Sequence, residues 1–229
     1  MCGRYNLVTP QEALRNLFSV DNTLPTLSPR YNIAPAQDAP VIISNGDGRR
    51  SMVMMRWGLV PSWSPNGPDN RFSMFNARAE TVSTKAAFRL AFRHRPCLVP
   101  VDGFYEWKKE KIGKTPHHFS MIDNTTFALA GLWESWRSHT DYTLHSFTII
   151  TTTANSLLSE IHARMPVIIP IESYQEWLSG DTTREQLLVP YPSSYMQTKT
   201  IGSYINKTSH DGPNCLTPVE HVDADNRLI

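Results

Sequence analysis

The second half of the chain contains a series of apolar segments of strand length, separated by short polar turns. These segments comprise residues 97–107, 117–122, 127–136, 144–153 and 166–169. Gly113 and Asp123-Asn124 supply turn residues between them. Strands that follow one another through short turns pair in antiparallel fashion. The pattern therefore predicts an α+β fold, built on a curled, largely antiparallel, barrel-like β-sheet with short flanking helices.

A β-hairpin is expected in the first half of the chain. Asn45-Gly46-Asp47-Gly48 joins two apolar runs at residues 41–44 and 52–57, and this is typical of two strands joined by a tight turn. The proline-rich stretch over residues 22–40 predicts a loop. The residues after 191 predict an irregular tail that packs over the sheet.

The predicted helices are short. Thr9 is a suitable N-cap, Pro10 fits the first helical position and Glu12 completes a capping box, so a helix is expected from there to about residue 18. Three further helices are expected, over about residues 83–93, 155–161 and 171–178.

Size and composition fit a single domain over residues 1–229. The chain has 6 Trp, 8 Tyr and 9 Phe, which is too many aromatic residues for a disordered protein. Nowhere do about 18 apolar residues run together, so the sequence predicts no transmembrane helix and no membrane partner. We expect the motif-bearing part over about residues 1–170 and an irregular segment over about 190–229.

Charge is distributed unevenly along the chain. The formal net charge is only +1, but residues 1–100 hold 12 Lys and Arg against 6 Asp and Glu, whereas residues 101–229 hold 10 against 15. Such an asymmetry indicates a polyanionic partner on one face, although two halves that neutralise each other within one fold would give the same counts. The small total charge therefore does not exclude a nucleic-acid partner.

The three cysteines, Cys2, Cys97 and Cys215, favour a reducing compartment. Their number is odd, and no CxxC pair or Cys/His cluster has the spacing of a zinc site, so we expect no metal and no cofactor. Cys97 lies in an apolar run and is expected in the core. The first residues hold no apolar stretch of signal-peptide length, which predicts a cytoplasmic protein, nucleoid-associated in a bacterium. We also expect a monomer.

Cys2 has chemical properties that no internal cysteine has. Removal of Met1 would place an α-amine and a thiol on the same residue. The amine has an ordinary pKa of about 7.7–8.0, against about 10.4 for a lysine, so a useful share of it is neutral near pH 7.4. A neutral amine attacks an aldehyde to form an imine, and the neighbouring thiol can then close a five-membered thiazolidine ring. An N-terminal cysteine can also serve as a nucleophile for amide hydrolysis.

Four further segments are dense in groups that could serve a site. Each has an ordinary structural explanation as well, such as a turn at Asn76, a surface ion pair at Glu106 or a helix C-terminus at His162. The segments are Arg30-Tyr31-Asn32-Ile33-Ala34-Pro35, Phe75-Asn76-Ala77-Arg78-Ala79-Glu80, Asp102-Gly103-Phe104-Tyr105-Glu106-Trp107 and His162-Ala163-Arg164-Met165-Pro166.

Taken together and in order, these motifs resemble those of the SRAP (SOS response-associated peptidase) family of abasic-site processing proteins. The resemblance includes Met-Cys-Gly-Arg-Tyr at residues 1–5, Trp-Gly-Leu-Val-Pro at 57–61 and the four segments above. It covers about residues 1–170. The resemblance implies a protein of the DNA damage response that binds single-stranded DNA. It would cross-link Cys2 to the ring-opened aldehyde of an abasic site as a thiazolidine, a self-cross-linking, lyase-type chemistry.

The resemblance also implies roles for individual residues. Asn76 would position the N-terminus, Glu106 would act as a general acid and base, and His162 would handle protons at the sugar hydroxyl. The predicted contacts with DNA are made by Arg4, Arg78 and Arg164 at phosphates, with Asn32 in the same site, and by Pro35 and Trp63 as a wedge and a stacking surface. The structural alternative for Trp63 is a loop-packing residue.

Two other functions fit the same residues. One is a cysteine peptidase or N-terminal-nucleophile amidohydrolase, in which Cys2 acts with His162 and with Asn76 or Glu106. The other is a non-catalytic protein that binds single-stranded DNA whether or not an abasic site is present.

Overall fold

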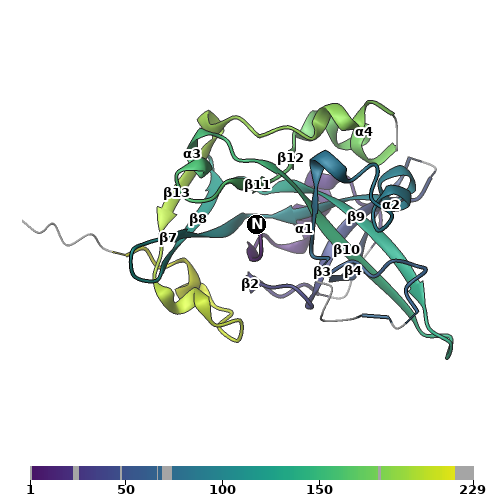
Figure 1. The fold of residues 1–229 in the computed structure, drawn as a ribbon, viewed down its shortest axis with the longest axis horizontal. Coiled ribbons are helices and arrows are strands. Elements are labelled where there is room, and N and C mark those ends of the chain that lie inside the picture. Colours follow the sequence, from purple (N-terminus) through teal and green to yellow (C-terminus); the bar gives the residue numbers. More distant parts are fainter. Residues whose placement is uncertain are drawn as a thin grey trace, which may run out of the picture.

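A closed barrel of five strands forms the centre of the computed structural model, which describes residues 2–22, 26–46, 48–65, 67–68, 74–179 and 182–219. Its strands are β3 (Asp38–Ser44), β4 (Arg50–Trp57), β6 (Pro96–Val101), β9 (Phe127–Arg137) and β10 (Thr143–Thr153). The ring closes because β9 pairs with both β6 and β10. Figure 1 labels β3, β4, β9 and β10 of this ring. Only the β10–β4 pair of this ring is parallel. The predicted α+β fold with a barrel-like, largely antiparallel sheet is confirmed.

Strand β6 is buried along its whole length because both of its faces are covered. Outside the barrel, helix α4 (Tyr174–Ser179) packs on it, and the Trp177 indole N–H donates a hydrogen bond to the Cys97 carbonyl at 2.8 Å. On the neighbouring strand, Gly131 of β9 lies opposite Cys97, and a Cβ at this position would come within 2.7 Å of the Cys97 Sγ. This close approach requires glycine at position 131. Cys97 is a core residue, as predicted.

A second antiparallel sheet continues from the barrel. Its order is β13 (Met196–Thr200), β8 (Lys114–Met121), β7 (Gly103–Lys109), β1 (Tyr5–Leu7), β2 (Arg30–Ile33). The predicted single strand over residues 97–107 is therefore wrong, because the chain turns at Asp102 from the barrel into the second sheet. The Asp102 carboxylate secures this corner by accepting hydrogen bonds from the Val8 and Thr9 backbone N–H groups and from the Thr9 and Thr126 hydroxyls.

Helix α1 (Gln11–Phe18) forms where the sequence predicts a helix, but its predicted capping box is wrong. The Thr9 hydroxyl is committed to Asp102 at 2.7 Å, and Pro10 occupies the N-cap without a side-chain hydrogen bond. The predicted helices over residues 155–161 and 171–178 are confirmed as α3 (Ser156–Ser159) and as α4 with the preceding 3-10 turn.

The helix predicted over residues 83–93 is too long, since α2 spans only Arg89–His94. Over residues 82–88 the chain forms turns instead of a continuous helix. The Lys85 N–H donates to the Thr81 carbonyl at 2.9 Å, and the Phe88 N–H donates to the Lys85 carbonyl at 2.9 Å. Phe88 is buried where α2 begins.

The hairpin of β3 and β4 is confirmed, with Asp38 opposite Arg56 and Ser44 opposite Arg50; Asp47 of its turn lies outside the described residues. The predicted loop over residues 22–40 is wrong, because it contains β2 and the start of β3. The tail after residue 191 is irregular only in part, because β13 pairs with β8. No helix in the described part of the chain is long and apolar enough to cross a bilayer.

Candidate functional site

Cys2 is completely buried and is held by Asn76. Asn76 begins the short strand β5 (Asn76–Arg78), which lies parallel to β10 with Asn76 opposite Ile149. Its Nδ2 donates a hydrogen bond to the Cys2 carbonyl at 2.7 Å. The Oδ1 of the same amide is buried, and no hydrogen-bond partner for it occurs in the described part of the chain. The structure thus brings two of the predicted catalytic residues into contact.

Glu106 lies close to the Cys2 thiol. It is buried on β7, where the Tyr105 N–H donates a hydrogen bond to the Arg4 carbonyl at 3.0 Å and so aligns this strand with the first residues of the chain. Burial raises the pKa of the Cys2 thiol well above its ordinary value, and the negative charge of Glu106 acts in the same direction. The sulfur is therefore held as a thiol rather than as a thiolate.

His162 lies in the turn between α3 and β11 (Arg164–Pro166). Its backbone N–H donates to the Leu158 carbonyl at 2.8 Å, and the Arg164 N–H donates to its Nδ1 at 3.0 Å. Nδ1 also lies 3.1 Å from the Arg164 carbonyl oxygen, so this ring nitrogen faces the Arg164 backbone. Strand β11 pairs with residues 151–153 of β10, and β5 pairs with residues 149–151. His162 and Asn76 are therefore carried by segments that meet the same end of β10.

Two of the predicted phosphate-binding arginines flank this end of β10. Arg78 is exposed on β5 opposite Thr151. Arg164 is paired through Nη1 and Nη2 with both carboxylate oxygens of Glu80, and its Nη2 also donates to the Thr151 carbonyl. Hydrogen bonding from Arg164 holds the pKa of Glu80 below its ordinary value. A carboxylate thus occupies the fork of Arg164 in the geometry that a phosphate would use. Sequence reasoning assigned Glu80 no role, although it belongs to a quoted motif.

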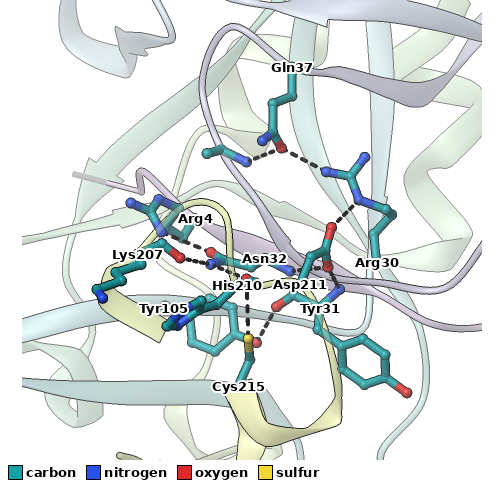
Figure 2. A network of polar contacts seen from close by, with 11 residues as sticks. Arg4, Arg30, Tyr31, Asn32, Gln37, Tyr105, Lys207, His210, Asp211 and Cys215 are labelled. Carbon is teal, nitrogen blue, oxygen red and sulfur yellow. Dashed lines mark hydrogen bonds and ion pairs between the residues drawn. The ribbon is translucent and has the colours of Figure 1, made fainter. Parts of the chain in front are cut away.

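Arg4 and Asn32 belong to a network that includes residues 207–215 (Figure 2). The Arg4 Nη1 donates to the Asn32 Oδ1 at 2.9 Å and to the Ile205 carbonyl at 3.1 Å. Asn32 is completely buried, and its Nδ2 donates to three backbone carbonyls of residues 205–210. In this conformation Asn32 presents no surface to a ligand, because its side chain is completely buried among these partners.

The two residues predicted to contact bases lie on separate turns. Pro35 is half-buried between β2 and β3, where the following Ala36 N–H donates to the Trp57 carbonyl at 2.7 Å. Trp63 is 60% exposed in the turn after β4. An exposed indole of this kind offers a face on which a base can stack.

The described residues hold no group of three or more His, Cys, Asp or Glu side chains placed to bind a metal ion. The arrangement can instead position an N-terminal aminothiol, supply a carboxyl group and an imidazole for proton transfer, and bind an anion through arginines.

The fold and this site define a member of the SRAP family. The family model described as "SOS response associated peptidase (SRAP)" matches residues 1–208, beyond the predicted limit of the motif-bearing part near residue 170. The chain is 35% identical to "Abasic site processing protein YoaM" of Bacillus subtilis over 229 residues, which cover 97% of this chain and all of that protein. It is 29% identical over 273 residues to "Abasic site processing protein HMCES" of Pongo abelii, with 97% and 77% covered.

A crystal structure of a protein from Bacteroides thetaiotaomicron has the same fold. The TM-score is 0.85 at 25% sequence identity, and the match covers 95% of this chain and 100% of that chain.

Proposed function

We propose that this protein processes abasic sites by forming a thiazolidine cross-link between Cys2, exposed by removal of Met1, and the ring-opened abasic aldehyde in single-stranded DNA. The observation that carries the proposal is the environment of Cys2. Asn76 holds its carbonyl, and burial beside Glu106 keeps its sulfur as a thiol. Relatives named as abasic site processing proteins support the choice of substrate.

The chemistry starts at nitrogen rather than at sulfur. The neutral α-amine attacks C1 of the aldehyde, and the carbinolamine loses water to give an imine. The Cys2 Sγ then bonds to C1 while the thiol proton is transferred to the ring nitrogen. One water leaves, and one C–N and one C–S bond form, so the step needs no oxidant, reductant or metal.

The neighbouring residues would serve this sequence as follows. Asn76 fixes the Cys2 backbone so that amine and thiol face the same carbon. Glu106, next to the sulfur, carries protons between thiol, amine and leaving water. His162 transfers a proton to the sugar oxygen as the ring opens.

The proposed DNA contacts surround this centre. Phosphates would be bound by Arg4, Arg78 and Arg164. Arg164 would have to release the Glu80 carboxylate before it binds a phosphate. Trp63 would stack on a base and Pro35 would separate its neighbours. Three phosphate contacts with a single strand predict that log K falls with log salt with a slope of about −2.

A cysteine peptidase fits this site less well. Such an enzyme attacks with a thiolate, which a nearby cation stabilises. The Cys2 thiol has the opposite environment, because burial and Glu106 both raise its pKa.

The test is incubation of the Met1-processed protein with single-stranded DNA that carries one abasic site. Intact mass before and after the reaction is expected to show loss of Met1 and a stable adduct that is absent with an intact strand. Cys2→Ala should abolish the adduct, whereas Cys97→Ala, which removes another buried free thiol, should leave it unchanged. An adduct that persists in Cys2→Ala would refute the proposal. Equal binding of both strands without an adduct would instead support the non-catalytic DNA-binding function. Peptide hydrolysis lost in Cys2→Ala would support the peptidase.

A further inference from the structure

The segment over residues 201–216, here called the C-terminal segment, lies against the first strands of the chain. It contains two 3-10 turns, η5 (Ser203–Asn206) and η6 (Pro213–Leu216), and follows β13 (yellow in Figure 1). The family match ends at residue 208, so the second half of this segment lies beyond it. Sequence reasoning gave the segment no function.

Asn32 joins this segment to Arg4. Its Nδ2 donates to the carbonyls of Lys207 and His210 at 3.0 and 2.7 Å, while its Oδ1 accepts from Arg4 Nη1 at 2.9 Å (Figure 2). The same Nδ2 also donates to the Ile205 carbonyl at 3.3 Å. One buried amide therefore orients the C-terminal segment and the guanidinium together.

The C-terminal segment also contacts Arg4 directly through Ile205 and indirectly through Trp107 of β7. The Ile205 carbonyl accepts a second hydrogen bond from Arg4 Nη1 at 3.1 Å. The guanidinium carbon lies 5.8 Å from the centre of the Trp107 ring, and the Trp107 indole N–H donates to the Asn206 Oδ1 at 2.7 Å. Arg4 Nη1 donates both of these hydrogen bonds, to Asn32 and to Ile205, and Nη2 donates neither.

Asp211 attaches the far end of the segment to β2. Its Oδ1 accepts from the backbone N–H groups of Tyr31 and Asn32, the second at 3.0 Å, and its Oδ2 pairs with Arg30. The Asp211 side chain is 24% exposed, so part of this attachment is shielded from water. β2 is an edge strand of its sheet, and Asp211 satisfies two of the donors on that edge.

We propose that Asn32 and the C-terminal segment position Arg4 for a DNA phosphate, and that Asp211 keeps the segment in place. The inference rests on the proposed function, since it assumes that Arg4 meets the DNA backbone. A long arginine side chain that is ordered before the ligand arrives loses less freedom on binding than a mobile one. Asn32, Asp211 and the Ile205 carbonyl are positioning groups and need not touch DNA themselves.

The experiment compares reversible binding of an intact single-stranded oligonucleotide by fluorescence anisotropy over a salt series. Each phosphate contact contributes about −0.7 to the slope of log K against log salt, which equals a change of about 2.6-fold in affinity between 50 and 200 mM. Arg4→Gln and Asn32→Ala are each expected to reduce the slope by that amount. The double variant should reduce it no further, because both changes remove the same contact. Asn22→Ala is the control, since it removes two side-chain hydrogen bonds to the backbone of Met52, on strand β4 of the barrel.

The positioning role is refuted if folded Asn32→Ala keeps the wild-type slope, or if its effect adds to that of Arg4→Gln. Should Asn32→Ala fail to fold, Asp211→Asn, at a partly exposed site, carries the test, and an unchanged slope in that variant refutes the role. A wild-type protein that binds the intact strand but forms no adduct with the abasic strand would refute the proposed cross-link instead. The salt slopes would still decide whether Asn32 acts through Arg4.

Discussion

The corner at Asp102 allows a quantitative prediction for stability. Four hydrogen bonds end on its carboxylate, two from the N–H groups of Val8 and Thr9 and two from the hydroxyls of Thr9 and Thr126. Asp102→Ala leaves both N–H groups without their acceptor, and a buried donor left in this way costs about 1–3 kcal/mol. The two hydroxyls are 2.7 Å apart and can bond each other, so they add little. Because the site is only partly buried, we expect Asp102→Ala to lower the free energy of unfolding by about 3 kcal/mol.

Asp102→Asn should cost much less. Its Oδ1 can face the two N–H donors while its amide group faces the two hydroxyl oxygens, which are able to accept. The geometry of the corner then survives without the charge, and we expect a loss of about 1 kcal/mol. The difference between the two variants measures the hydrogen bonds rather than the size of the side chain.

Urea unfolding followed by tryptophan fluorescence is the appropriate measurement, with the midpoint lowered and the slope m unchanged. Asp141→Asn serves as the control, because its ion pair with Arg137 is exposed and should contribute less than about 0.5 kcal/mol. The reasoning fails if Asp102→Ala costs less than about 1 kcal/mol, or if Asn at this position is as damaging as Ala.

Three further outcomes are expected. Asn76→Ala removes the buried hydrogen bond to Cys2 and should slow adduct formation by about 10- to 100-fold in single-turnover assays, with binding of an intact strand unchanged; an unchanged rate would contradict this. Glu80→Gln removes the negative charge that competes with a DNA phosphate for Arg164, so it should tighten DNA binding about threefold. Weaker binding would contradict this and would mean that Glu80 orients Arg164 for the DNA. In the folded protein, burial lowers the pKa of His118 from 6.5 to about 4. As the pH falls, this histidine is therefore protonated in the unfolded chain before it is protonated in the folded protein. Stability should therefore drop by about 2 kcal/mol between pH 7.5 and pH 5, and His118→Gln should remove that part of the dependence in urea titrations.

Much of the candidate site could be found from the sequence because its residues lie in short motifs that fold locally. Asn76 and Arg78 share one strand, and His162 and Arg164 share one turn, so each motif keeps its members together wherever it is placed. The contact between Asn76 and Cys2 joins residues far apart in sequence, and it depends on the pairing of β5 with β10 and of β1 with β7. The roles of Glu80 and Asn32 could not be predicted, because their partners come from distant parts of the chain.

Local patterns determined the two hairpins of the barrel, β3–β4 and β9–β10. Apolar runs of strand length, turn residues between them and the Asn45-Gly46-Asp47-Gly48 turn specify antiparallel neighbours through short-range geometry, and the structure follows them.

Tertiary structure alone decided where the strands end and which parts of the chain form hydrogen bonds with the backbone groups at the strand edges. The apolar run over residues 97–107 does not show the turn at Asp102, because that turn depends on donors from residues 8, 9 and 126. Likewise β2 and β13 have weak local signals and form because partner strands and Asp211 supply their hydrogen bonds. Periodicity is a property of neighbouring residues, whereas a backbone donor can be satisfied by any part of the chain that the fold brings to it.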